Sequence, residues 1–134
     1  MGNTIKALIR QIAPSTSEAM VRNHRVAVDR PVEKGGADQG PMGGELFLAS
    51  IGGCFMSTLL AAIRARELEI SGVQTEVTGT LADSPARFVS VELLVTADHP
   101  DRETVEKLVQ IAERSCIMTN TLRGLLDLKV SLRS

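Results

Sequence analysis

The feature that most constrains this chain is an uncharged run near its middle. Residues Leu46–Ile63 hold eighteen positions without a charged side chain, which is the lower end of the length that spans a membrane. The run also contains glycine, serine and threonine, and the chain has no Trp or Tyr to anchor a helix at a membrane interface. A helix that is apolar all round also suits the centre of a soluble protein. We therefore expect no membrane span, and a helix covered by a sheet or by a second subunit.

Length and composition indicate a globular protein of one domain, residues 1–134. Hydrophobic residues make up 43% of the chain and charged residues 23%, which is ordinary for a folded domain. The aromatic content of 2% predicts an aliphatic core, and with a net charge of −1 it argues against a nucleic-acid partner. The first eleven residues lack the pattern of a signal peptide, so we expect a cytoplasmic location.

The first third of the chain reads as strands followed by a loop. Residues 4–12 and 18–29 are short apolar stretches with partial alternation, which predicts an N-terminal β-meander. Residues 30–44 contain five glycines and two prolines, so they predict a loop long enough to be functional. The central helix is then expected from about Glu45 to Leu68.

The remainder alternates between strand and helix patterns. Val73–Thr80, Phe88–Ala97 and Leu126–Leu132 alternate as strands should. Between them, Asp101–Ser115 has an apolar stripe of helical period, formed by Val105, Leu108, Val109 and Ala112. A short helix is expected over Met118–Arg123, ending at Gly124. The predicted fold class is α+β, with the element order βββ-α-ββ-α-α-β.

Two cysteines, Cys54 and Cys116, are separated by 62 positions and form no CxxC pair, so neither a zinc ribbon nor a thioredoxin motif is indicated. Each is open to a packing interpretation, because free cysteine often behaves as a small buried hydrophobe. Gly52 and Gly53 precede Cys54 and each cost a helix about 1 kcal/mol, which predicts that another element approaches closely there. Cys116 lies just before a short helix, whose N-terminus favours a thiolate.

A metal site is not expected. His24 and His99 are scattered relative to the two cysteines, and none of the four lies at ligand spacing. His24 is predicted to be an exposed or packing residue in a strand, and His99 to belong to the turn before Pro100.

Two stretches resemble one known family. The run GPMGGELFLASIGGCFMSTLLAAIRAR resembles the central helix of the OsmC and organic hydroperoxide resistance (Ohr) family, and AERSCIMTNTL resembles its second cysteine motif. The resemblance covers about residues 20–134. It implies the OsmC-like fold, in which two chains form an intertwined homodimer around their central helices, with Gly52 and Gly53 at a close crossing.

The resemblance also implies a chemistry. Cys54 would be the peroxidatic cysteine, which reduces an organic hydroperoxide in oxidative stress defence, and Cys116 the resolving cysteine. An external dithiol, often a protein-bound lipoyl group, would reduce the resulting disulfide, without a metal or organic cofactor. Apolar surroundings favour an organic hydroperoxide over hydrogen peroxide.

The family's supporting residues match less well. Its peroxidases place a glutamate ten residues before the first cysteine, where this chain has Gly44. Glu45 is nine residues before Cys54, about 180° around the helix, and also suits the first turn as an acid. For the activating arginine we take Arg25 and Arg30 as candidates, each with a solvated strand arginine as the alternative.

Two other functions stay open. The same thiols would serve a redox sensor that passes oxidation to a partner. The Gly44 departure favours a second alternative, a non-catalytic OsmC-fold protein that binds a small apolar ligand and uses its thiols for packing.

Overall fold

The computed structural model describes residues 2–134. By their contacts they form two compact units, one ending at Phe47 and the other spanning Leu48–Ser134, and each is described by itself. Whether they act as the single predicted domain stays a prediction.

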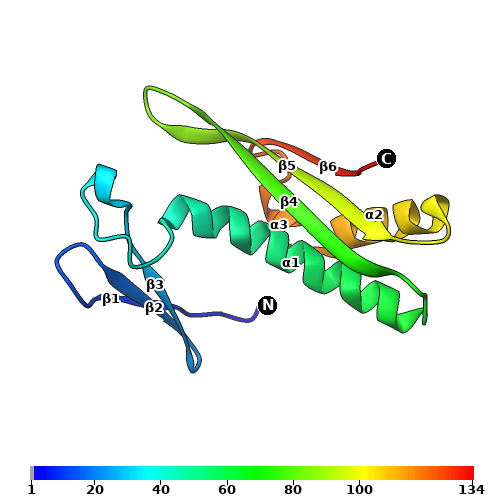
Figure 1. Cartoon of the computed structure of the whole chain (residues 1–134), viewed down its shortest axis with the longest axis horizontal. Helices are drawn as coiled ribbons and strands as arrows, with labels where there is room; N and C mark the ends of the chain where they lie inside the picture. The colour runs from blue at the N-terminus through cyan, green and yellow to red at the C-terminus, as the bar shows by residue number, and fades with distance from the viewer. Residues whose placement is uncertain (1) are drawn as a thin grey trace. The chain divides into compact units, whose positions relative to one another are not determined.

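The first unit contains the predicted β-meander. Its strands are β1 (Leu8–Gln11), β2 (Ser17–Val21) and β3 (His24–Val28), paired antiparallel in that order (Figure 1). The stretch 18–29 holds two strands, because Arg22 adopts a left-handed φ of 55° and turns the chain. The loop that follows contains one short 3₁₀ helix, η1 (Val32–Lys34).

Helix α1 (Gly43–Ala65) is the central helix that the uncharged run predicted. It begins two residues before Glu45, whose carboxylate accepts a hydrogen bond of 2.8 Å from the amide of Met42 and so caps the first turn. It ends three residues before Leu68, because Glu67 takes a left-handed φ of 51°. By length and composition α1 is the one described helix that could cross a membrane, and 33% of its most apolar window is buried in the chain.

The second unit contains a three-stranded sheet. Strands β4 (Ser71–Ala82) and β5 (Arg87–Asp98) form an antiparallel hairpin, and β6 (Asp127–Leu132) pairs with β5 in parallel. The register aligns Val77, Leu93 and Val130 across the sheet, so these residues share a face. On that face Val91, Leu93 and Val95 of the central strand are fully buried.

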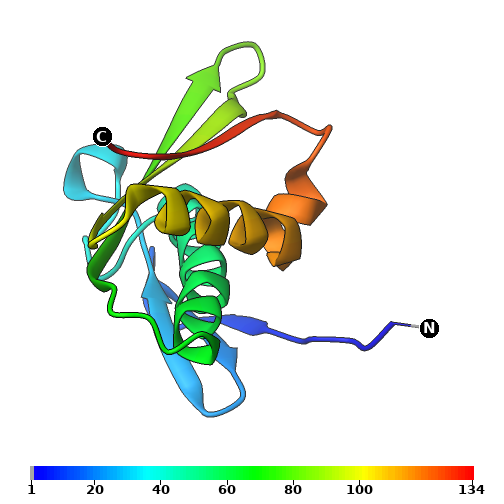
Figure 2. The ribbon, with the colours of Figure 1, turned by 90° about the vertical axis from the view of Figure 1, so that its right-hand side faces the viewer.

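Helices cover this buried face (Figure 2). A Cβ added to Gly52 of α1 would lie 2.8 Å from Cγ2 of Val77, so the helix backbone closely approaches β4. Helix α2 (Arg102–Ser115) begins at the cap Asp101 and buries the predicted stripe of Val105, Leu108, Val109 and Ala112. The short helix α3 (Ile117–Leu122) follows, and Gly124 has the left-handed φ of 84° expected of a helix stop.

Candidate thiol redox site

Cys54 and Cys116 meet in the second unit. Their Sγ atoms lie 3.3 Å apart, and the Cys116 thiol donates a hydrogen bond to the sulfur of Cys54. A disulfide bond is about 2.05 Å long, so the two atoms need to approach by only roughly 1.2 Å to bond. The geometry therefore permits a disulfide with small side-chain movements.

The two thiols differ in their access to solvent. Cys116 is fully buried, with 0% of its surface exposed, whereas Cys54 is partly exposed. A reagent that enters from solvent therefore meets Cys54 first in this chain. Cys116 offers no exposed surface to such a reagent.

The position of Cys54 follows from the packing of α1. Its neighbours Ile51 and Phe55 are fully buried, and they fix the rotation of the helix about its axis. The Cys54 carbonyl accepts the intrahelical bond and also a 3.1 Å bond from the Thr58 hydroxyl. Cys54 is thus held at the edge of the packed face.

Cys116 lies at the junction of two helices. Its extended backbone, with φ −78° and ψ 127°, ends α2 and begins α3. Because it follows Ala112 by four residues, it continues the buried stripe of α2. The turn into α3 then aims the amides of Met118 and Thr119 at the sulfur.

The pKa of Cys116 differs from expectation. Burial is the largest influence and raises the pKa of this thiol, and the contact with Cys54 raises it further. Hydrogen bonds from Thr119 and Met118 at the start of α3 lower the pKa but do not outweigh burial. The prediction that the helix N-terminus makes this thiolate more available is therefore wrong in its net direction.

One buried side chain beside Cys116 was missed by the sequence analysis. Thr119 has 0% of its surface exposed, and its hydroxyl bonds the carbonyl oxygens of Glu113 and Cys116. It joins the end of α2 to the start of α3. The available signal was its place three residues after Cys116, at the second position of the predicted short helix.

The three other candidate residues lie in the first unit. Glu45 caps α1 through the amide of Met42. Arg25 is exposed and forms an ion pair of 3.6 Å with Glu18 on the neighbouring strand. Arg30 is exposed and lines a cavity of the first unit. Any action of these three residues on the thiols stays a prediction.

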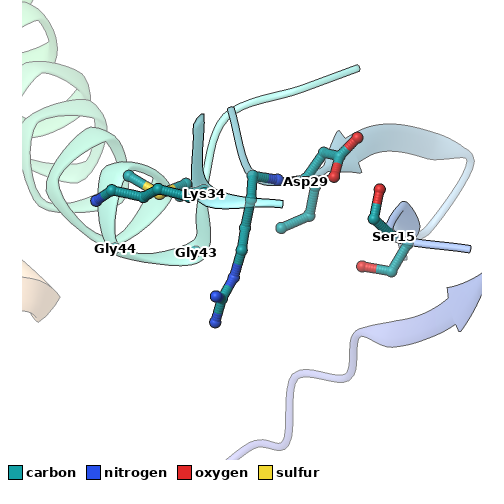
Figure 3. Close-up of a pocket in the computed structure, with 9 residues that line it drawn as sticks. Ser15, Asp29, Lys34, Gly43 and Gly44 are labelled. Carbon is teal, nitrogen blue, oxygen red and sulfur yellow. Dashed lines mark hydrogen bonds between the residues drawn. The ribbon is translucent and has the colours of Figure 1, made fainter. Parts of the chain in front are cut away.

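That cavity is organised by Asp29, which the sequence analysis did not single out. It has a volume of about 470 Å³ and is lined by Ser15, Ser17, Val28, Asp29, Arg30, Lys34, Met42, Gly43 and Gly44 (Figure 3). The Asp29 carboxylate accepts bonds from the Thr16 hydroxyl and from the amides of Arg30, Ala37 and Gln39. Burial raises the pKa of Asp29, but these bonds outweigh it and lower the pKa from 3.8 to about 2.

Metal ligands do not gather within residues 2–134, where no group of three or more His, Cys, Asp or Glu side chains is placed to hold an ion. His24 is exposed on β3, and His99 immediately precedes Pro100.

Comparison with known proteins agrees with the fold. A family profile described as OsmC-like protein matches residues 35–131. This chain belongs to the OsmC-like family. A relative from Bacillus subtilis (strain 168), described as organic hydroperoxide resistance protein OhrB, is 30% identical over 91 residues, or 66% of this chain and 67% of that protein.

Solved structures share the OsmC-like fold. An OsmC-like protein from Mycoplasma pneumoniae aligns with a TM-score of 0.85 at 19% identity, covering 99% of this chain and 98% of that one. The crystal structure of OhrB from Bacillus subtilis aligns with a TM-score of 0.72 at 23% identity, covering 98% of each chain. The OsmC-like, α+β architecture expected from the sequence is thus confirmed.

Proposed function

We propose that this OsmC-like protein reduces organic hydroperoxides with Cys54 and Cys116. The observation that carries the proposal is the 3.3 Å contact between two thiols that are 62 residues apart in the sequence. The relative described as an organic hydroperoxide resistance protein supports the substrate class. The apolar residues around Cys54 also favour an alkyl hydroperoxide over hydrogen peroxide.

The reaction divides into three balanced steps. The Cys54 thiolate attacks the terminal peroxide oxygen, the O–O bond breaks, and the alkoxide takes a proton to leave as alcohol, with Cys54 oxidised to a sulfenic acid. The Cys116 sulfur then attacks the Cys54 sulfur, and the hydroxyl leaves as water with the thiol proton. An external dithiol finally reduces the disulfide to two thiols and is itself oxidised to a disulfide.

The first step needs positive charge near Cys54. A cation favours the thiolate and stabilises the developing alkoxide. Arg25 and Arg30 are our candidates for this role, with Glu45 as the orienting acid. Arg25 already pairs with Glu18, and Glu45 caps α1, so each would have to exchange a present contact for the catalytic one.

A homodimer and a lipoyl-type dithiol complete the proposal. Along α1, some of the residues exposed in the single chain form a stripe that recurs every three or four positions and is mostly small, namely Ala49, Gly53, Ser57, Leu60 and Arg64. A stripe of small residues allows another helix to approach closely, and the partner we propose is a second copy of this chain.

Intact mass of the reduced protein after one equivalent of cumene hydroperoxide tests the proposal. We expect a fast loss of about 2 mass units, absent from Cys54→Ser and from Cys116→Ser. In Cys116→Ser a gain of about 16 should persist, because the sulfenic acid on Cys54 cannot be resolved. Unchanged mass after an hour would rule out the peroxidase.

A thiol redox sensor is the second candidate. The buried Cys116 with its raised pKa, together with the use of Glu45 as a helix cap, favours slow oxidation and a persistent disulfide. Turnover with excess dithiol separates the two functions. A reductase consumes many equivalents of hydroperoxide, whereas a sensor reacts slowly and stops at one.

A further inference from the structure

The Thr119 hydroxyl has more hydrogen-bond acceptors within reach than its single proton can bond at one time. The side chain is fully buried, and its hydroxyl oxygen lies within bonding distance of the carbonyl oxygens of Glu113 and Cys116, the latter at 3.1 Å. A hydroxyl donates one hydrogen bond at a time and rotates to suit its surroundings. The proton therefore has alternative positions in this site.

The Thr119 hydroxyl, which lies 3.1 Å from the carbonyl oxygen of Cys116, also favours the thiolate form of that residue. Hydrogen bonds from the hydroxyl and the amide of Thr119 both lower the pKa of Cys116 against the effect of burial. The thiol donates to Cys54, so its sulfur has a free lone pair for a donor on the other side.

We propose that Thr119 is a positioning residue of the thiol pair, whose hydroxyl turns from the backbone carbonyls to the Cys116 sulfur when that sulfur becomes a thiolate. The inference rests on the proposed function, because it assigns Thr119 a part in the redox cycle of Cys54 and Cys116. The Thr119 hydroxyl acts through Cys116 and does not itself touch the hydroperoxide.

Two steps of the cycle place negative charge on Cys116. In resolution, its thiolate attacks the Cys54 sulfenic acid, the S–S bond forms, and the departing hydroxide takes a proton to become water. In reduction, a thiolate of the dithiol attacks the more exposed Cys54 sulfur, and the S–S bond breaks with its electron pair on Cys116. Since Cys116 has no exposed surface, the charge depends on donors supplied by the protein.

The thiolate of Cys116 can be titrated directly. In a Cys54→Ser background Cys116 is the sole cysteine, and because the chain has no Tyr or Trp, the ultraviolet absorbance of the thiolate has no tyrosinate background. Into this background we would introduce Thr119→Val, which removes the hydroxyl at nearly constant volume, and Thr119→Ser, which keeps it. Thr121→Val is the matched control, since Thr121 lies in α3, is exposed, and donates 2.7 Å to the Ile117 carbonyl.

We expect Thr119→Val to move the titration midpoint to higher pH, Thr119→Ser to restore it, and Thr121→Val to leave it unchanged. With both cysteines present, Thr119→Val should slow disulfide formation by about tenfold or more, because hydrogen bonds to charged groups are the strong ones. If the threonine only supported the packing, its loss would admit water, and relief from burial would move the midpoint to lower pH.

A midpoint in Thr119→Val that is unchanged or lower would overturn the inference, as would failure of Thr119→Ser to restore it. If Thr119→Val does not fold, Thr119→Ala against Thr119→Ser makes the same comparison. The titration uses no hydroperoxide, so its result is independent of the peroxidase assay. A shifted midpoint with no hydroperoxide turnover would support the role of Thr119 and reject the proposed function.

Discussion

Gly52 and Gly53 are neighbours in α1, yet they meet different surroundings. A Cβ at Gly52 would lie 2.8 Å from Val77 Cγ2, closer than side chains ordinarily pack, whereas a Cβ at Gly53 would meet nothing within 4 Å in the chain. The sequence predicted a close approach at both, attributed to a helix crossing. At Gly52 the neighbour is instead strand β4.

We predict that Gly52→Ala destabilises the fold by about 1–3 kcal/mol, because the added methyl group overpacks the contact between α1 and β4. Urea unfolding followed by circular dichroism measures the change. In a Val77→Ala background the penalty should largely disappear, since the clashing Cγ2 is gone. An equal penalty in both backgrounds would show that Val77 is not the source.

The carboxylate of Asp29 organises the loop that follows strand β3. Its four hydrogen bonds hold strand β3, the loop after it and Thr16 together. The loop of residues 30–44 was predicted from its glycines and prolines, but its organising residue was not. Asp29 has no periodic pattern around it, and its role appears only when the loop folds back over it.

The low pKa of Asp29 predicts a loss of stability in acid. In the unfolded chain the carboxyl takes up its proton near pH 3.8, whereas in the folded protein it stays charged down to about pH 2. The unfolded chain therefore binds more protons between these values, so acid favours unfolding. The contribution of Asp29 is complete above this window and is lost as the pH falls through it.

Denaturant unfolding at several pH values tests this prediction. The stability difference between wild type and Asp29→Asn should be largest above about pH 4 and should shrink towards about pH 2. Asp38→Asn is a suitable control, because Asp38 is an exposed acid of the same loop. A difference that is constant with pH would show that the charge of Asp29 does not stabilise the fold.

Helix α2 was predicted almost to the residue, because its amphipathic stripe is a local signal, and Asp101, the predicted first residue, is its cap. We predict that Leu108→Ala, in the buried stripe, costs about 2–5 kcal/mol. Lys107→Ala should change stability by less than about 0.5 kcal/mol, since its ion pair with Glu103 is exposed. Thermal and urea unfolding of both variants check the contrast, and similar losses would contradict the burial of the stripe.

Local patterns also predicted the order of the strands and α-helices in the described residues, but they carry no information on pairing. Strand β6 lies parallel to β5. The connection through α2 and α3 makes this possible, because it brings the chain back to the end of the sheet at which β5 begins. The ends of α1 were misplaced by two or three residues, because a cap at Met42 and a left-handed Glu67 decide them. Such contacts form only in the folded chain.

At the scale of the whole molecule, the thiol pair depends on tertiary structure. The two cysteines are 62 positions apart in the sequence, and only the packing of α1 and of the α2–α3 junction brings the sulfurs to 3.3 Å. The raised pKa of Cys116 has the same origin, since burial is set by the complete fold and outweighs the local effect of α3. Family resemblance supplied the pairing that spacing did not.

The central helix carries the last prediction. Its exposed stripe contains Leu60, which is 42% exposed in the chain, within a helix otherwise suited to burial. In the proposed homodimer this stripe is covered, so Leu60→Glu would bury an unpaired charge and weaken association by about a hundredfold or more.

Leu81→Glu, at an exposed position on β4, is the control. Sedimentation velocity should find a dimer for wild type and Leu81→Glu and a folded monomer for Leu60→Glu. A wild-type monomer would reject the homodimer, and a stable Leu60→Glu dimer would place its interface away from this stripe.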